Sequence, residues 1–185
     1  MRVITGKLKG RKIPVPNTDL LRPTSDRTKE GIFSVIAART YLDNTRVLDL
    51  FAGSGNLGFE AISRGAENVL FVDRETAHLQ QIEKTSKTFG VENQISTIAL
   101  DIEIFLEKKE FGSFDFIFAD PPYDYFWMVE MVEQIMNSDL LKEDGWFVLE
   151  HDKRHDFSEH PLCRFSKPYG RTVAAIFRHT DEGFK

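Results

Sequence analysis

The alternation of short apolar runs with longer amphipathic segments, which begins at Arg46, constrains the fold most strongly. The apolar runs read VLDLF, NVLFV, ISTIAL, FDFIFA and WFVLE, and helices are expected near 57–64, 75–89, 102–109 and 126–137. Continuously apolar strands separated by helices are typical of a parallel sheet that helices cover on both faces, with right-handed crossovers. This part of the chain therefore predicts an α/β fold with a mainly parallel sheet.

The two ends of the chain depart from this rhythm. Residues 163–178 predict two strands around Tyr169-Gly170, a hairpin that would close one edge of the sheet. Residues 1–17 alternate in short apolar steps around Gly6 and Gly10, which predicts an N-terminal β-hairpin, and a helix is expected over 25–39. We therefore expect a basic hairpin and helix over 1–40 and a Rossmann-like domain over 41–185, packed as one compact unit.

Charge is spread unevenly along the chain. The net charge is −5, but residues 1–30 hold eight Lys and Arg against three acids, which is +5 and leaves −10 for the remainder. A basic arm on an acidic body is one form that a phosphate-binding surface takes. The other interpretation of the same residues is a solvated hairpin face, and charge alone does not separate the two.

Composition excludes several classes of protein. No run of about 18 apolar residues is present and the first residues lack the apolar stretch of a secretory signal, so we expect a cytoplasmic protein without membrane contact. Cys163 is the single cysteine and the five His residues are scattered, which predicts neither a disulfide nor a metal site.

A glycine-rich motif, DLFAGSGNLG, leaves the first apolar run and leads into the first helix of the alternating region. Glycines let the backbone turn tightly and approach a ligand, and Asp73, twenty residues after Gly53, is placed to accept ribose hydroxyls. Asp49, at the end of the strand, suits the ammonium and sulfonium of S-adenosylmethionine better than a pyrophosphate. Asp101 could accept a hydrogen bond from the adenine amine, or could be only the N-cap of the next helix.

A second motif, Asp120-Pro-Pro-Tyr123, follows the apolar run FDFIFA. Ligands of open parallel sheets collect at the carboxyl ends of strands beside the switch in strand order, so both motifs should converge there. The Asp120 carboxylate and the Pro121 carbonyl could accept hydrogens from a base amine, while Tyr123 stacks on the base. The competing interpretation is a rigid turn that ends a strand and carries a core aromatic residue.

The remaining candidates are less specific. Segment 22–30 offers Arg and Lys for phosphates and a helix cap at Thr24 or Ser25, although Glu30 could instead pair with Arg27. Phe126 and Trp127 could be stacking platforms, but burial in the core is the expectation. A structural role is also expected for Glu150 and His151.

Nearly the whole chain resembles bacterial methyltransferases of the RsmD type, which methylate a guanine N2 of 16S ribosomal RNA. The likeness runs through ITGKLKGRKIPVP, LRPTSDRTKEGIF, DLFAGSGNLGFEAISRGA, FVDRE, FADPPY and YGRTVAAIFR. It implies a seven-stranded Rossmann-like fold with an antiparallel last strand, S-adenosylmethionine as cofactor, and an assembling small ribosomal subunit as partner. The implied activity is that of a 16S rRNA (guanine(966)-N(2))-methyltransferase.

The resemblance also assigns roles by position. The residues that would bind the cofactor are Asp49, Phe51, Ala52, Gly53, Ser54, Gly55, Asp73, Arg74, Asp101 and Ile102. Catalysis would fall to Asp120, Pro121 and Tyr123, and substrate binding to Lys7, Arg11, Arg22, Thr24, Arg27 and Pro122.

Three alternatives stay open from the sequence. An adenine-N6 methyltransferase acting on DNA or RNA would use D-P-P-Y equally well, although 185 residues leave little room for a separate DNA-reading domain. An NAD-dependent oxidoreductase would use the same glycine-rich turn and Asp73, but no proton donor is evident. A non-catalytic RNA-binding module would leave Asp49, Asp73 and D-P-P-Y without a purpose.

Overall fold

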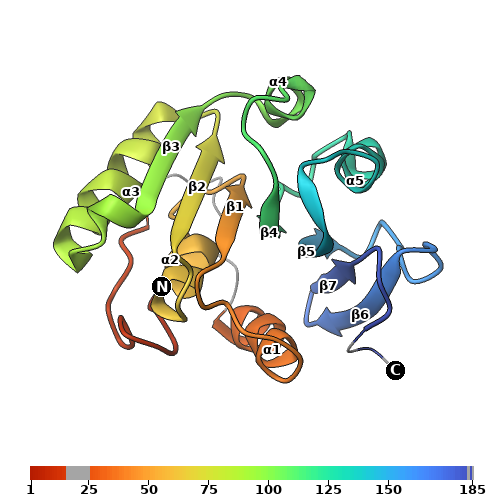
Figure 1. The fold of residues 1–185 in the computed structure, drawn as a ribbon, viewed down its shortest axis with the longest axis horizontal. Helices are drawn as coiled ribbons and strands as arrows, with labels where there is room; N and C mark the ends of the chain where they lie inside the picture. Colours follow the sequence, from red (N-terminus) through yellow and green to blue (C-terminus); the bar gives the residue numbers. More distant parts are fainter. Residues whose placement is uncertain (16–25, 183, 185) are drawn as a thin grey trace.

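The computed structural model describes residues 1–15, 26–182 and 184, and a central sheet crosses the whole molecule (Figure 1). Seven strands of the described chain form this sheet in the order β3-β2-β1-β4-β5-β7-β6, as expected for the Rossmann-like methyltransferase fold. Strands β1 to β5 pair in parallel, and β7 runs antiparallel between β5 and β6. The bounds are β1 Arg46–Leu50, β2 Asn68–Asp73, β3 Ile95–Ala99, β4 Phe114–Ala119, β5 Leu141–Asp152, β6 Cys163–Tyr169 and β7 Thr172–Phe177.

Helices cover both faces of the sheet, as the apolar character of its strands predicted (Figure 1). One face packs against α1, α2 and α3, and the other packs against α4 and α5. Successive side chains of a strand point to opposite faces of the sheet, so neighbours such as Val47 and Leu48 lie in separate apolar clusters. The bounds are α1 Asp26–Ala37, α2 Asn56–Ser63, α3 Thr76–Phe89, α4 Ile102–Glu107 and α5 Met128–Met136, with a 3-10 turn at Glu92–Gln94.

The strand order reverses at β1, which is where the two motifs meet. Leu50 pairs with Val72 of β2 on one side and with Ala119 of β4 on the other. The glycine-rich loop after β1 and Asp120 after β4 therefore leave the same edge of the sheet from adjacent strands.

The predicted N-terminal hairpin is wrong. The described arm contains one isolated antiparallel bridge, Arg2 with Lys12, in place of two strands. The chain does turn back on itself, since Val3 donates to the Arg11 carbonyl and Ile13 to the Met1 carbonyl, but this pairing does not extend into a ladder because the next amides bond to α2. Ile4 and Thr5 donate to the Glu60 carboxylate at 2.8 and 3.1 Å.

Apolar arm residues nevertheless enter the core. Val3, Leu8 and Ile13 are buried in the same cluster as residues of α1, α2 and α3. Gly6 permits this close approach, because it has a φ of 89° and a Cβ there would lie 1.8 Å from the carbonyl oxygen of Ser63. The arm therefore lies flat on α2.

The C-terminal hairpin is confirmed as β6 and β7, joined at Tyr169-Gly170. Its tip packs on α1, since a Cβ at Gly31 would lie 2.3 Å from Cε1 of Tyr169. Strand β5 begins earlier than its apolar run suggested. Its pairing with β4 shifts in register between Phe114 and Phe116, because Phe114 pairs with Leu141 and Phe116 with Trp146. Residues 142–145 therefore form a bulge in β5.

Within the described residues, no helix has the length and apolar character needed to cross a membrane. The same part of the chain holds no group of three or more His, Cys, Asp or Glu that could bind a metal ion.

Candidate active site

The site is built around the buried carboxylate of Asp49 in β1. Its Oδ2 accepts the backbone N–H of Gly58 at 2.8 Å, and the side chain has no cationic partner among the described residues. Burial raises the pKa of Asp49 well above its usual range, and the carboxylates of Asp120 and Asp73 raise it further, against the Gly58 N–H. The pairing of Leu50 with Ala119 places the residues that follow β1 and β4 side by side, so the two sequence motifs meet at the same edge of the sheet.

Gly58 is required by packing. A Cβ at this position would lie 2.2 Å from Cε1 of Phe71 and 2.9 Å from Oδ2 of Asp49. The third glycine of the motif therefore lets α2 pack closely on β2 and places its backbone N–H against the carboxylate.

The loop between β1 and α2 has an unusual backbone. Phe51, Gly53 and Gly55 all have positive φ, at 56°, 54° and 76°. Phe51 is strained there because a side chain disfavours this region, whereas the two glycines are not. Two hydrogen bonds fix the turn: Ala52 donates to the Val72 carbonyl at 3.1 Å and Gly55 to the Ala52 carbonyl at 2.7 Å.

Asp73 is held in place by its neighbours. Oδ2 accepts the N–H of Gly53 at 2.8 Å and lies 3.1 Å from Nδ1 of His78, while Oδ1 accepts the N–H of Glu75 at 2.8 Å. The acid thereby joins the glycine-rich loop to the start of α3. His78, the third residue of α3, was missed by the sequence analysis.

The other cofactor candidates surround this loop. Asp101 occupies the N-cap position of α4 without a side-chain capping bond, so its exposed carboxylate is not used by the helix. Ile102, Ala52 and Ser54 are buried. The Ser54 hydroxyl lies 4.0 Å from Sδ of Met1. Arg74 is exposed and pairs with Glu75 at 3.4 Å.

The D-P-P-Y loop is docked onto the glycine-rich loop. The ring of Tyr125 meets that of Phe51 edge to face, with centroids 4.9 Å apart and planes at 72°. Burial and the Glu103 carboxylate of α4 raise the pKa of Tyr125, whose backbone N–H donates to the Pro122 carbonyl at 2.9 Å. Within the motif, Pro121 is buried, Asp120 is half-buried, and Pro122 and Tyr123 are exposed.

A buried ion pair ties the N-terminal arm to α1 and α2. Nζ of Lys29 lies 3.4 Å from Oε2 of Glu60 and donates to the Arg2 carbonyl at 2.7 Å and to Oδ1 of Asn56 at 2.6 Å. Burial lowers the pKa of Lys29, and Glu60 opposes that shift. Nδ2 of Asn56 is buried and has no hydrogen-bond partner in the described chain.

The substrate-binding candidates fall in different places. Nζ of Lys7 donates to Gln94 at 2.6 Å and Arg11 to the Thr88 carbonyl at 2.9 Å, at the amino end of β3. That edge is opposite to Asp120, so the structure does not bring these two residues to the site. Arg27 is exposed in the first turn of α1, and Arg22 and Thr24 lie outside the described residues.

The expected burial of Phe126 and Trp127 is wrong. Phe126 is 81% exposed and Trp127 is 50% exposed. The reason is that α5 begins at Met128, two residues later than predicted, and its own Met and Val residues supply the buried face. Glu150 and His151 are both buried at the end of β5, and burial lowers the pKa of His151.

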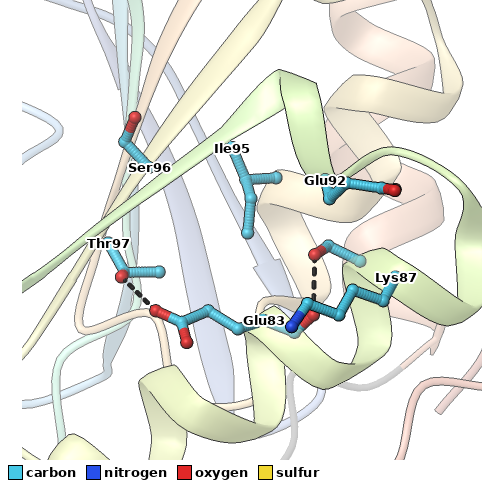
Figure 2. A pocket seen from close by; sticks show the side chains of 7 residues that line it. Glu83, Lys87, Glu92, Ile95, Ser96 and Thr97 are labelled. Atoms are coloured by element: carbon cyan, nitrogen blue, oxygen red, sulfur yellow. Dashed lines mark hydrogen bonds between the residues drawn. The ribbon is translucent and has the colours of Figure 1, made fainter.

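A surface pocket lies away from all these candidates, between α3 and the edge strand β3 (Figure 2). It is lined by Glu83, Ser86, Lys87, Glu92, Ile95, Ser96 and Thr97. The Thr97 hydroxyl donates to Glu83 across it at 2.7 Å (Figure 2). None of the candidate residues lines this pocket, so it does not bear on the chemistry of the strand ends.

The carboxylates at the strand ends fit S-adenosylmethionine. Asp49 is a buried acid that no cation pairs with in the part of the chain that the structure describes, and an ammonium or sulfonium nearby would stabilise its charged form. The exposed Asp101 carboxylate and the positioned Asp73 carboxylate can accept hydrogen bonds from an amine and from hydroxyls.

Comparisons with known proteins agree with this geometry. The family described as Conserved hypothetical protein 95 matches residues 1–178. "Putative rRNA methyltransferase YlbH" of Bacillus subtilis is 39% identical over 96% of this chain and 98% of its own. "Ribosomal RNA small subunit methyltransferase D" of Escherichia coli is 35% identical over 81% of this chain and 71% of its own. The solved structure of "Putative methyltransferase yhhF" from Escherichia coli has a TM-score of 0.82 and 28% identity, and 96% of each chain is covered.

Proposed function

The chain belongs to the Conserved hypothetical protein 95 family, and from that membership we propose that it methylates N2 of guanine 966 in 16S ribosomal RNA. At the coarser level the chain is an S-adenosylmethionine-dependent rRNA methyltransferase of the RsmD type. The observation that supports the proposal is the pairing of Leu50 in β1 with Ala119 in β4, which places the cofactor loop and the D-P-P-Y loop side by side at one edge of the sheet. The proposed setting is an assembling small ribosomal subunit.

The D-P-P-Y loop supplies the groups that a guanine amine needs. The lone pair of this amine is delocalised into the base, so the amine is a poor nucleophile. The Asp120 carboxylate and the Pro121 carbonyl accept its two hydrogens, which favours a lone pair localised on nitrogen and aimed at the methyl group. Tyr123, 36% exposed, stacks on the base. Asp120 receives the proton that the amine releases.

The glycine-rich loop holds the cofactor in this account. S-adenosylmethionine, when bound, supplies the methyl group and leaves as a neutral thioether. Asp49 faces its cationic end, Asp73 accepts its ribose hydroxyls and Asp101 accepts its adenine amine. The contact of Phe51 with Tyr125 holds the glycine-rich loop in a fixed position relative to Asp120. Transfer is direct, so positioning supplies most of the rate.

The proposal is tested by replacing Asp120 with alanine. Asp120→Ala is expected to bind S-adenosylmethionine normally by calorimetry and to lose methyl transfer to unmodified small subunits by about 100-fold or more. Asp124→Ala is the matched control, since this exposed acid lies in the same loop and outside the motif. Near wild-type turnover by Asp120→Ala would remove the role assigned to this carboxylate.

A further inference from the structure

Two aromatic rings beside the D-P-P-Y loop are exposed in the described structure. Phe126 is 81% exposed and Trp127 is 50% exposed, although rings of this size are ordinarily among the most buried side chains. Their centroids are 5.5 Å apart and their planes meet at 86°. The two rings therefore pack edge to face against each other while remaining exposed to solvent.

The backbone under the two rings is anchored on both sides. Tyr125, the residue before them, donates its N–H to the Pro122 carbonyl at 2.9 Å. The Trp127 carbonyl accepts the N–H of Met131 at 2.9 Å, in the first turn of α5. The backbone that carries the rings is thus held between the D-P-P-Y motif and α5, so binding to the rings does not require this segment of the chain to be ordered first.

Charge near the rings distinguishes between the parts of a nucleotide. Asp124 and Glu130 flank the pair in the sequence, and α5 contains acids but no Lys or Arg. Acids repel a phosphate, so the pair is not a backbone-binding site. An uncharged base has a π-face that stacks on aromatic rings without needing a basic neighbour.

We propose that Phe126 and Trp127 form a stacking platform for an unpaired base next to the guanine in the rRNA substrate. The inference rests on the proposed function and adds a substrate contact to it. Phe126 and Trp127 follow Tyr123 by three and four residues and are exposed, so a base next to the guanine at Asp120 is within the part of the strand that this surface can contact. Stacking there binds the neighbouring base and not the guanine itself, so the platform acts on substrate affinity and not on the chemical step.

The first experiment separates a ring from a merely apolar side chain. The double variant Phe126→Leu with Trp127→Leu removes both π-faces, and Phe126→Tyr with Trp127→Phe keeps them. The leucine variant should raise the KM for RNA by roughly 5- to 100-fold with a nearly unchanged kcat, and the aromatic variant should match wild type. Affinity for S-adenosylmethionine and thermal stability should not change in either.

Val129→Ala is the matched control, because Val129 is 50% exposed on the same surface and has no ring. An unchanged KM in Val129→Ala supports stacking. A rise in KM equal to that of the leucine variant would mean that the surface contacts an apolar protein partner, and a wild-type KM in the leucine variant would mean that it contacts no base; each result overturns the proposal.

Fluorescence gives a readout that does not depend on turnover. Trp146 is only 4% exposed, so quenching by a single-stranded RNA that contains the target guanine should come from Trp127 and disappear in Trp127→Phe. Quenching that persists in Trp127→Phe would overturn the stacking. Failure of the wild-type enzyme to methylate any rRNA would instead overturn the proposed function, whereas normal methylation with unaffected leucine variants would overturn the platform alone.

Discussion

The backbone N–H of Gly58 donates to Oδ2 of Asp49 at 2.8 Å, and a Cβ on Gly58 would approach that same oxygen to 2.9 Å. The contact means that the first turn of α2 lies directly on the carboxylate that the cofactor loop surrounds. Changes at either residue should therefore affect both the fold and the binding of S-adenosylmethionine.

Replacing Gly58 with alanine should destabilise the protein. Alanine in a helix ordinarily stabilises relative to glycine by about 0.5–1 kcal/mol, but here its Cβ would lie 2.2 Å from the fully buried ring of Phe71. The expected net loss in the free energy of unfolding is about 1–3 kcal/mol, measured by urea denaturation. Gly31→Ala is the matched comparison, with a smaller loss, because the half-buried ring of Tyr169 can move away. A stabilised Gly58→Ala would contradict this packing.

Asp49→Asn should stabilise the protein without ligand and weaken cofactor binding. A carboxyl group whose pKa is raised by folding binds its proton more tightly in the folded state. The stabilisation that this tighter proton binding gives the folded state is fully present below the unfolded pKa of about 4. It is lost as the pH rises through the raised pKa of the folded state. The gain in melting temperature of Asp49→Asn over wild type should therefore grow from pH 4 to pH 8. A gain that does not depend on pH would contradict the raised pKa.

The affinity for S-adenosylmethionine should also depend on the titration of Asp49. It should rise with pH, whereas the stability that Asp49 contributes falls. The cationic end of S-adenosylmethionine favours the charged form of Asp49, so the affinity of the wild-type protein should rise as the pH increases through the raised pKa. Calorimetry in buffers of different ionisation enthalpy should detect proton release on binding below that pKa. Asp49→Asn should show weak binding at every pH, without proton release from this group.

Tyr125 should link the two loops through its ring. Tyr125→Ala removes the edge-to-face contact with Phe51 and should reduce methyl transfer by about 10-fold or more, since small misplacements of reacting groups are expensive. Tyr125→Phe keeps the ring contact with Phe51 and loses only the hydroxyl, so it should retain most of the activity. Equal losses in both variants would place the importance of Tyr125 in its hydroxyl instead.

The buried pair of Lys29 and Glu60 should dominate the stability of the N-terminal arm. Both side chains are fully buried, and Glu60→Gln would remove the counter-charge of the Lys29 ammonium and of Arg64, whose Nε lies 2.8 Å from Oε1 of Glu60, at a loss of about 3–5 kcal/mol. Glu110→Gln is the control, because its ion pair with Lys108 is exposed and should leave the urea midpoint nearly unchanged. A mild effect of Glu60→Gln would mean that the arm does not depend on this pair.

The central sheet could be predicted because its strands are nearly continuous apolar runs. The position of Asp49 and Asp120 at adjacent strand ends followed from the same pattern, since the carboxyl ends of parallel strands share an edge. The C-terminal hairpin around Tyr169-Gly170 was also correctly read from its turn residues.

The N-terminal arm could not be predicted, because its amides bond to Glu60, which looks like an ordinary polar residue of a helix. Pairing between Lys29 and Glu60 is likewise a tertiary contact that leaves no periodic signal. Phe126 and Trp127 were misassigned because they adjoin the apolar stripe of α5, and a two-residue error in the helix start moves both rings from solvent to core.

The most direct test of the account maps the nucleotide that receives the methyl group. The purified protein is incubated with labelled S-adenosylmethionine and small ribosomal subunits that lack the modification, and the rRNA is digested and sequenced around the label. The account predicts a single N2-methylguanine at position 966 of 16S rRNA, absent with Asp120→Ala. Label on the N6 of an adenine, or label that appears in duplex DNA and not in the subunit, would contradict it.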